Sequence, residues 1–326
     1  MKVKKSTQYT SFKPIWWLRN HHLQTLWPAL FRRSLEVTVR HERRELPDGD
    51  FLDLAWAGDE TKPIVLILHG LGGSLDSTYV IRVMNAIVAQ GWCALLMHFR
   101  GASGTPNRVD RSYHSGDTGD LAWLLAQIVQ TTTQPVAVVG YSLGGNVLLK
   151  WLGEGVAIPK QVCAAVAVSV PFELAKVANK LQQRGSRFYQ WYLLRKLKQD
   201  YQQKFHNRSA PIPITHVQQL KTFWQFDDEV TAPLNGFVDV HDYYHRSSSR
   251  QYLRHIDVPT LVIHAKDDPF MTPDVIPALT EVSPMVQLEI SEKGGHVGFI
   301  GANKTGKAQF WLEQRIVEYI KHFFSP

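Results

Sequence analysis

A serine enclosed by glycines stands near the middle of the sequence. Residues 135–146 read PVAVVGYSLGGN, in which apolar and β-branched residues lead into the pattern G-x-S-x-G around Ser142. The apolar run predicts a buried strand, and the residues after the serine predict a helix. A strand that turns sharply into a helix favours glycine on both sides and pushes the serine hydroxyl outward. The pattern indicates a nucleophile, and a plain helix N-cap is the alternative.

A serine hydroxyl becomes a nucleophile when a base removes its proton, and a carboxylate orients that base. Both partners occur downstream of Ser142, the acid before the base. TLVIHAKDDPFMTPD places Asp267 and Asp268 just after an apolar run, and EKGGHVGFIG places His296 in a glycine-rich loop. Alone, either could be an ordinary turn residue. Together they predict a catalytic triad of Ser142, Asp268 and His296; Asp268 is preferred because it lies further along the loop, and Asp267 is the second choice.

Backbone donors for a developing negative charge are predicted beside the serine. Attack of the hydroxyl on a carbonyl creates an oxyanion, which N–H groups stabilise. The stretch IVLILHGLGG, residues 64–73, is a predicted strand that runs into closely spaced glycines, which let the backbone approach a substrate. We predict the N–H groups of Leu71 and Leu143 as the oxyanion hole. His69 is expected to form structural hydrogen bonds beneath this loop, because His296 already serves as the base.

The elements that must position these groups alternate between two patterns. Short apolar runs bounded by turn residues predict strands, and longer amphipathic runs predict helices between them. This alternation is typical of a mostly parallel sheet with helices on both faces. The predicted strands are 35–40, 51–57, 64–69, 94–99, 136–140, 164–170, 261–265 and 286–290, and the predicted helices are 77–90, 118–129, 142–152 and 309–323.

The strand rhythm stops between residues 172 and 250. This segment holds helical, aromatic and basic stretches such as FELAKVANKLQQRGSRFYQWYLLRKLKQDYQQKF. A helical insertion between two strands becomes a cap above the strand ends, the side on which open α/β sheets bind ligands. We predict a single domain over 1–326, with a core at approximately 34–171 and 251–326, a cap at approximately 172–250 and an N-terminal extension at 1–33.

Composition and charge limit the partners. The net charge of +7 is scattered along the chain, which argues against nucleic acid. The basic and aromatic stretch 184–204 could lie on an anionic membrane; the favoured interpretation is a cap helix whose apolar face covers the site and whose charges are solvated. His241 and His245 have the spacing of a metal pair on a helix but lack the glutamate of the zinc pattern. Neither a metal nor a cofactor is expected.

The remaining composition favours a soluble cytoplasmic protein. The 326 residues, 44% of them hydrophobic, can bury a sizeable core. No stretch offers about 20 uninterrupted apolar residues, and the N-terminus lacks the apolar core of a signal peptide. Cys93 and Cys163 both lie in predicted buried strands, so reduced core thiols are expected rather than a disulfide. The sequence carries no signal for an oligomeric state.

Seven motifs together resemble one known family. They are HGLGGS, HFRGASG, HSGDTGDL, GYSLGGN, FDDEVTAPLNGF, AKDDPF and GGHVGF. With HHLQTLWP near the N-terminus, they are similar over nearly the whole chain to the AB hydrolase 4 family of the α/β-hydrolase superfamily, in its bacterial YheT-type branch. The resemblance implies an α/β-hydrolase fold, with an about eight-stranded, mostly parallel sheet flanked by helices and a helical cap insertion. It also implies a triad carried onto Ser142, Asp268 and His296.

The resemblance to this family implies that the protein is a serine hydrolase of the carboxylesterase type. The expected substrates are small-molecule acyl esters of short to medium chain length, cleaved through an acyl-enzyme on Ser142. Two alternatives stay open. An acyltransferase or ester synthase would pass the same acyl group to an alcohol, and a non-catalytic binding protein could use the same fold.

Overall fold

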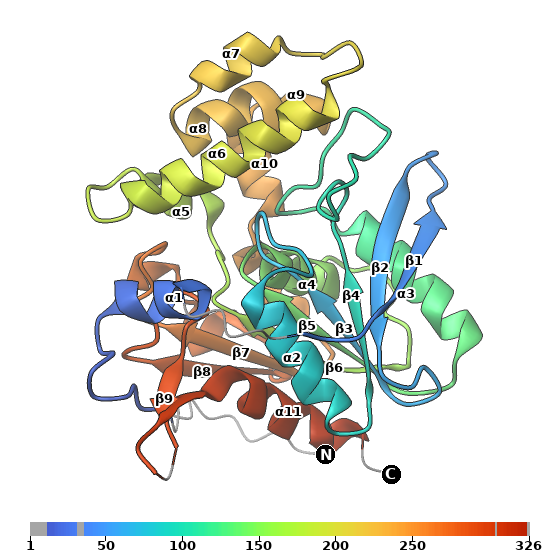
Figure 1. Cartoon of the computed structure of the whole chain (residues 1–326), viewed down its shortest axis with the longest axis vertical. Helices are drawn as coiled ribbons and strands as arrows, with labels where there is room; N and C mark the ends of the chain where they lie inside the picture. Colours follow the sequence, from blue (N-terminus) through green and yellow to red (C-terminus); the bar gives the residue numbers. More distant parts are fainter. Residues whose placement is uncertain (1–11, 31–35, 304, 325–326) are drawn as a thin grey trace.

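The computed structural model describes residues 12–30, 36–303 and 305–324 (Figure 1). The parts of the predicted N-terminal extension at 1–11 and 31–33 lie outside these described residues. None of the helices in the described ranges combines the length and the apolar composition that crossing a bilayer requires.

An eight-stranded sheet forms the centre, in the order β1-β2-β4-β3-β5-β6-β7-β8. The first two strand pairings, β1 with β2 and β2 with β4, are antiparallel, and the remaining pairings are parallel. The fold is therefore the predicted, mostly parallel α/β architecture. The strands are β1 (Arg40–Glu45), β2 (Phe51–Ala57), β3 (Ile64–Leu68), β4 (Cys93–Met97), β5 (Val136–Tyr141), β6 (Val162–Val168), β7 (Thr260–Ala265) and β8 (Val286–Ser291).

The first strand is where the sequence prediction is wrong. A strand was expected at 35–40, whereas β1 begins at Arg40 and reads RHERRE. Residue 35 lies outside the described part of the chain. An edge strand needs no apolar face, and ion pairs such as that of Arg43 with Asp53 hold β1 against β2. A polar edge strand therefore carries little of the alternation by which strands are recognised.

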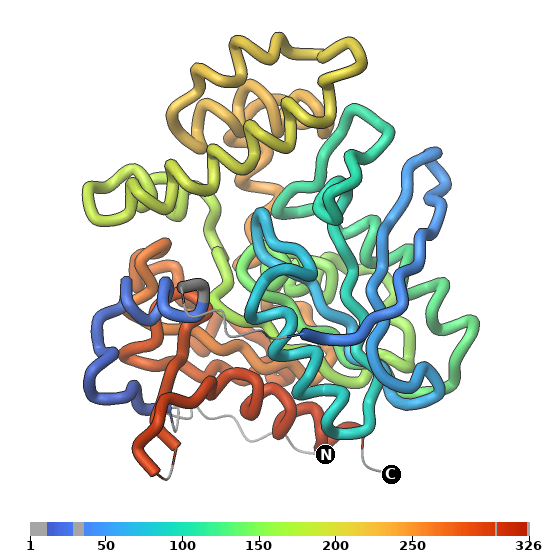
Figure 2. Tube along the Cα trace, viewed as in Figure 1, coloured from blue at the N-terminus to red at the C-terminus, as the bar shows by residue number. Residues whose placement is uncertain are grey.

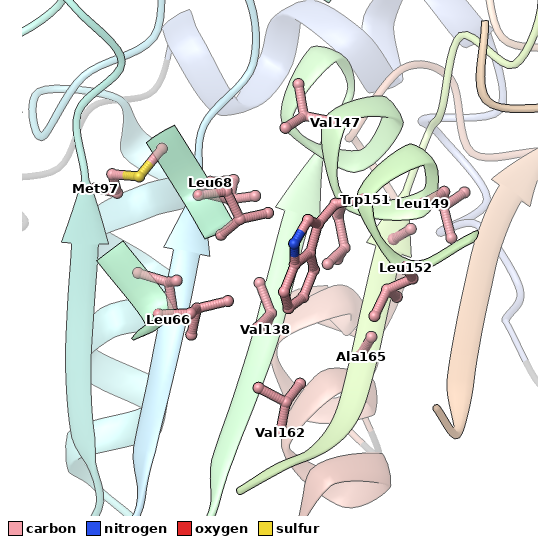
Figure 3. Close-up of a cluster of buried hydrophobic side chains, with 14 of the residues drawn as sticks. Leu66, Leu68, Met97, Val138, Val147, Leu149, Trp151, Leu152, Val162 and Ala165 are labelled. Carbon is pink, nitrogen blue, oxygen red and sulfur yellow. The ribbon is translucent and has the colours of Figure 1, made fainter. Parts of the chain in front are cut away.

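Helices cover both faces of the sheet. On β3, Leu66 and Leu68 pack with α3 (Gly119–Thr131) and α4 (Leu143–Gly153), as part of the cluster drawn in Figure 3. The alternate residues Val65 and Ile67 pack on the opposite face with α2 (Thr78–Val88) and α11 (Trp311–Phe324). Because β3 and β5 are buried on both faces, their sequences are continuous apolar runs.

A helical cap is inserted between β6 and β7 and forms a separate layer beyond the sheet (Figure 1). It has a hydrophobic cluster of its own, which includes Tyr189, Phe205 and Val217. Its elements are α5 (Leu174–Leu181), α6 (Arg187–Lys204), α7 (Ile214–Gln219), α8 (Phe223–Phe226), the π-helical turn η1 (Asp227–Thr231), α9 (Ala232–Leu234) and α10 (Val240–Ser247).

Short elements complete the fold. A helix, α1 (His21–Leu30), lies beside the hairpin of β9 (Ile300–Ala302) and β10 (Ala308–Phe310), which Figure 2 shows side by side. The Gln24 amide joins them, because its nitrogen donates to the Ile300 carbonyl at 3.0 Å and its oxygen accepts from the Ile300 N–H at 2.7 Å. Three 3-10 turns are η2 (Ser249–His255), η3 (Pro273–Val275) and η4 (Leu279–Glu281).

Candidate active site

Ser142 occupies a strained turn between β5 and α4. Its backbone has φ 50° and ψ −116°, a combination that non-glycine residues rarely adopt, and its N–H donates to the Val168 carbonyl at 2.8 Å. The turn brings backbone segments together: a Cβ on Gly140 would lie 2.5 Å from the Gly144 carbonyl oxygen, and one on Gly144 would lie 2.6 Å from the His69 carbonyl oxygen. These contacts explain why the pattern around the serine requires glycine.

The three predicted triad residues meet at one end of the parallel strands. Nε2 of His296 lies 3.0 Å from Oγ of Ser142, and Nδ1 of the same ring lies 2.7 Å from Oδ2 of Asp268. The other oxygen of Asp268 accepts from the Phe270 N–H at 2.8 Å, and the Phe270 ring stacks on the imidazole with centroids 4.0 Å apart. With its proton on Nδ1, the imidazole presents an acceptor to the serine hydroxyl.

Asp267, the second choice for the acid, points elsewhere. Its Oδ1 accepts from the Gly295 N–H at 3.0 Å, beneath the loop that carries His296. Burial raises the pKa of Asp267 from its usual range. This carboxyl therefore supports the histidine loop, and its neighbour Asp268 contacts the ring.

The histidine loop is held by residues that the sequence did not single out. The His296 N–H donates to Oγ1 of Thr25 at 2.9 Å, and the Val297 N–H donates to Oγ of Ser169 at 3.0 Å. Val297, Phe299 and Ser169 all have positive φ, which indicates a tightly specified backbone on both sides of this contact. Thr25 lies within HHLQTLWP, the one sequence feature that could have drawn attention to it.

The predicted oxyanion donors lie on two neighbouring segments. The N–H groups of Gly70 and Gly72, on either side of Leu71, donate to tyrosine hydroxyls at 2.9 and 3.0 Å. The Leu71 N–H between them makes no hydrogen bond within the described ranges of the chain. Leu143 is the first residue of α4, where backbone N–H groups lack an intrahelical partner. Both groups are therefore available to a ligand, and both residues line the cavity described below.

His69 has the structural role expected from the sequence. Its Nδ1 lies 2.7 Å from the Gly70 carbonyl oxygen, and its Nε2 accepts from the Phe99 N–H at 3.1 Å. Complete burial lowers the pKa of this imidazole to about 3. The ring is therefore neutral at physiological pH, and it braces the loop of Leu71.

A cavity of about 450 Å³ connects the triad with the cap. Its walls are mostly apolar, contributed by cap residues that include Leu174, Val177, Leu181, Leu193 and Phe223. A buried carboxyl also lines it. Asp227, at the start of the π-helical turn, accepts hydrogen bonds from the hydroxyls of Tyr244 and Thr231, both at 2.7 Å. Burial raises the pKa of Asp227 to about 6, against the opposing effect of these two hydrogen bonds.

Comparison with known proteins gives a consistent result. Residues 63–302 match the family described as alpha/beta hydrolase fold. The chain is 44% identical to YheT of Escherichia coli (strain K12), named as a candidate esterase, over 96% of this chain and 94% of YheT. It is 28% identical to a monoacylglycerol lipase of Saccharomyces cerevisiae, over 81% of this chain and 60% of that protein.

A solved structure shares the fold. The esterase Pf2001 of Pyrococcus furiosus superposes with a TM-score of 0.57 over 89% of this chain and 95% of its own, at 18% sequence identity. At that identity, the likeness bears on the fold alone.

Proposed function

Since the chain belongs to the α/β-hydrolase fold family and is a hydrolase of the esterase and lipase type, we propose that it cleaves short- to medium-chain acyl esters through a triad of Ser142, His296 and Asp268. One observation carries the proposal. The hydroxyl, the imidazole and the carboxylate form a continuous chain of contacts at 3.0 and 2.7 Å, on a strained turn that opens into the cavity.

The first half of the reaction transfers the acyl group to the serine. Oγ of Ser142 attacks the ester carbonyl carbon while Nε2 of His296 takes the hydroxyl proton. The carbonyl oxygen becomes negative and accepts hydrogen bonds from the N–H groups of Leu71 and Leu143. When the tetrahedral intermediate collapses, the bond to the alcohol oxygen breaks, and His296 gives its proton to the departing alcohol. Asp268 stabilises the imidazolium that exists between these transfers.

The second half releases the acid. A water molecule gives a proton to His296 as its oxygen attacks the acyl carbon, and the bond to Oγ of Ser142 then breaks. The proton on His296 returns to Oγ, which restores the free enzyme. The Phe270 ring covers one face of the imidazole and limits its rotation between these steps.

The cavity supports the proposed substrate class. Its apolar cap walls suit an acyl chain, and a volume of about 450 Å³ is of the size that encloses a small-molecule ligand. The relative named monoacylglycerol lipase adds support for acyl esters of small alcohols. A cytoplasmic location is also proposed, because Cys93 and Cys163 are free thiols, as a reducing compartment favours.

A fluorophosphonate probe tests the proposal directly. The purified protein is labelled, and the adduct is mapped by mass spectrometry beside Ser142→Ala and the matched control Ser74→Ala. We expect an adduct on Ser142 in the parent and the control, and none in Ser142→Ala. Turnover of a p-nitrophenyl ester should fall by roughly 10⁴- to 10⁶-fold in Ser142→Ala.

Two results would redirect the assignment. An unlabelled parent, or full turnover by Ser142→Ala, would contradict the triad and favour the binding protein. Ethyl esters as the main products in added ethanol would favour acyl transfer instead of hydrolysis.

A further inference from the structure

Exposed apolar side chains gather on two segments of the surface. Nine large apolar side chains are exposed in the described ranges, and six of them lie on α6 or in the segment that contains α1. The six are Trp16, Trp17, Leu23, Phe188, Trp191 and Tyr192. The sequence had favoured a cap helix with its apolar face turned inward, but Trp191 and Tyr192 are 54% and 60% exposed. Exposed apolar patches mark interaction surfaces, so these residues indicate a binding surface.

The two segments are neighbours in space. Nδ1 of His22 in α1 lies 2.9 Å from the hydroxyl of Tyr189 in α6, and the two rings stack with centroids 5.7 Å apart. Figure 1 shows α5 and the first half of α6 projecting from the cap on the side where α1 lies. The contact therefore makes α1 and α6 neighbours on the surface, and the segment with Trp16 and Trp17 leads directly into α1.

The face that these two segments form surrounds the entrance of the cavity. Phe188 and Tyr192 line the cavity and are also more than half exposed, so they lie at its rim. Thr25 and Leu26 of α1 line the same cavity. A molecule resting on this face would lie beside the opening that leads to Ser142.

The charge of the face is positive and largely uncompensated. Residues 174–199 contain seven lysines and arginines and no aspartate or glutamate. In the described part of the chain, carboxylates pair with Lys176 and Lys196. Arg184, Arg187 and Arg195 are exposed and have no such pair there. The guanidinium of Arg195 instead lies over the Trp191 ring, 5.5 Å from its centroid.

Exposed tryptophan and tyrosine rings beside unpaired cations match the chemistry of an anionic lipid surface. Amphipathic rings favour the bilayer interface, and arginines are attracted to acidic headgroups. We propose that the exposed residues of α6 and of segment 16–23 form a docking face for an anionic bilayer, with the cavity entrance turned toward the lipid. Its use in feeding lipid esters to Ser142 rests on the proposed function, whereas the docking itself does not.

Vesicle flotation of the full chain tests the docking face. Vesicles of phosphatidylglycerol and phosphatidylcholine are compared with vesicles of phosphatidylcholine alone, at low salt and at about 1 M salt, where screening is strong. We expect the parent to float with the anionic vesicles at low salt and to be released at high salt. Arg184→Glu with Arg187→Glu should reduce binding by at least about tenfold, and Trp16→Ser with Trp191→Ser by about tenfold.

Matched controls separate the face from general charge and hydrophobicity. Lys62→Glu with Lys160→Glu makes the same change in net charge elsewhere on the surface, and Val238→Ser removes an apolar side chain that is 89% exposed. Both controls should bind within about twofold of the parent. The proposed docking face is wrong if the parent fails to float with anionic vesicles, a result that would favour an acidic protein as the partner. It is also wrong if the control variants lose as much binding as the test variants.

The two proposals fail independently. Ser142→Ala should float as the parent does, because that serine contributes nothing to the docking face. The four substituted docking residues do not line the cavity, so hydrolysis of a short, water-soluble ester should be unchanged in their variants. This unchanged turnover also shows that the variants are folded. If the arginine variant fails to fold, the tryptophan variant carries the test.

Discussion

Two buried aspartates, Asp268 in the core and Asp227 in the cap, are held in different ways. Asp268 contacts the imidazole of His296, a partner that can become positively charged. Asp227 accepts hydrogen bonds from two neutral hydroxyls, and burial raises its pKa to about 6. The core therefore pairs its carboxyl with the base beside Ser142, whereas the cap carboxyl lies in the cavity wall and pairs with hydroxyl groups. The buried cap carboxyl is stabilised by the two hydroxyl groups that donate to it.

The role of the core carboxyl is tested by replacing each of two adjacent aspartates with asparagine. Asp268→Asn removes the charge that orients and stabilises the imidazole, so kcat for a soluble ester should fall by roughly 10⁴-fold. Asp267→Asn keeps an oxygen for the Gly295 N–H and should retain kcat within about tenfold. Steady-state kinetics on both variants, with thermal melts to establish folding, make the comparison. Equal losses in the two variants would remove the distinction between these carboxyls.

The role of the cap carboxyl is tested through the pH dependence of stability. The pKa of Asp227 is raised on folding, so its favourable contribution is complete below about pH 4 and is lost as pH rises through about 6. Asp227→Asn does not titrate. Relative to the parent, the variant should therefore gain up to about 3 kcal/mol in free energy of unfolding between pH 4 and pH 8. Urea denaturation at several pH values measures this, and a constant difference between the two proteins would show that folding does not raise the pKa of Asp227.

The smallest expected effect concerns the cavity wall. Val177→Phe places a ring in the space between the cap and Ser142, and should lower kcat/KM for a medium-chain ester about tenfold relative to the acetate. Val156→Phe, at an exposed position outside the cavity wall, is the control. A p-nitrophenyl ester series graded by chain length measures the ratio. An unchanged ratio in Val177→Phe would mean that the acyl chain does not lie against α5.

The core was predictable where local sequence determines local structure. The buried strand before Ser142 and the glycines around it indicate the turn, and part of the steric requirement is local, since a Cβ on Gly140 would meet the Gly144 backbone. The preference for Asp268 over Asp267 followed from loop position, and the structure places Asp268 on the ring. The strand at 40–45 was misplaced because an exposed edge leaves little hydrophobic pattern.

The remaining features depend on distant contacts. Thr25 and Ser169 reach the histidine loop across 271 and 128 residues, and no local pattern marks either of them. The orientation of the cap helices also depends on contacts between residues that are distant in the sequence. The sequence of α6 has aromatic residues on more than one side of the helix. Packing against α1 and α8 determines which of them face the cavity and which face solvent.

The hydrogen bond between the His296 N–H and Thr25 has a consequence for the order of events during synthesis. It joins residues that are 271 positions apart, so the loop that carries the base is fixed only after both segments have been synthesised. Ser142 precedes His296 by 154 positions, so it is synthesised well before its base. Ser142 therefore has no base beside it until the segment with His296 has been made and has folded against Thr25.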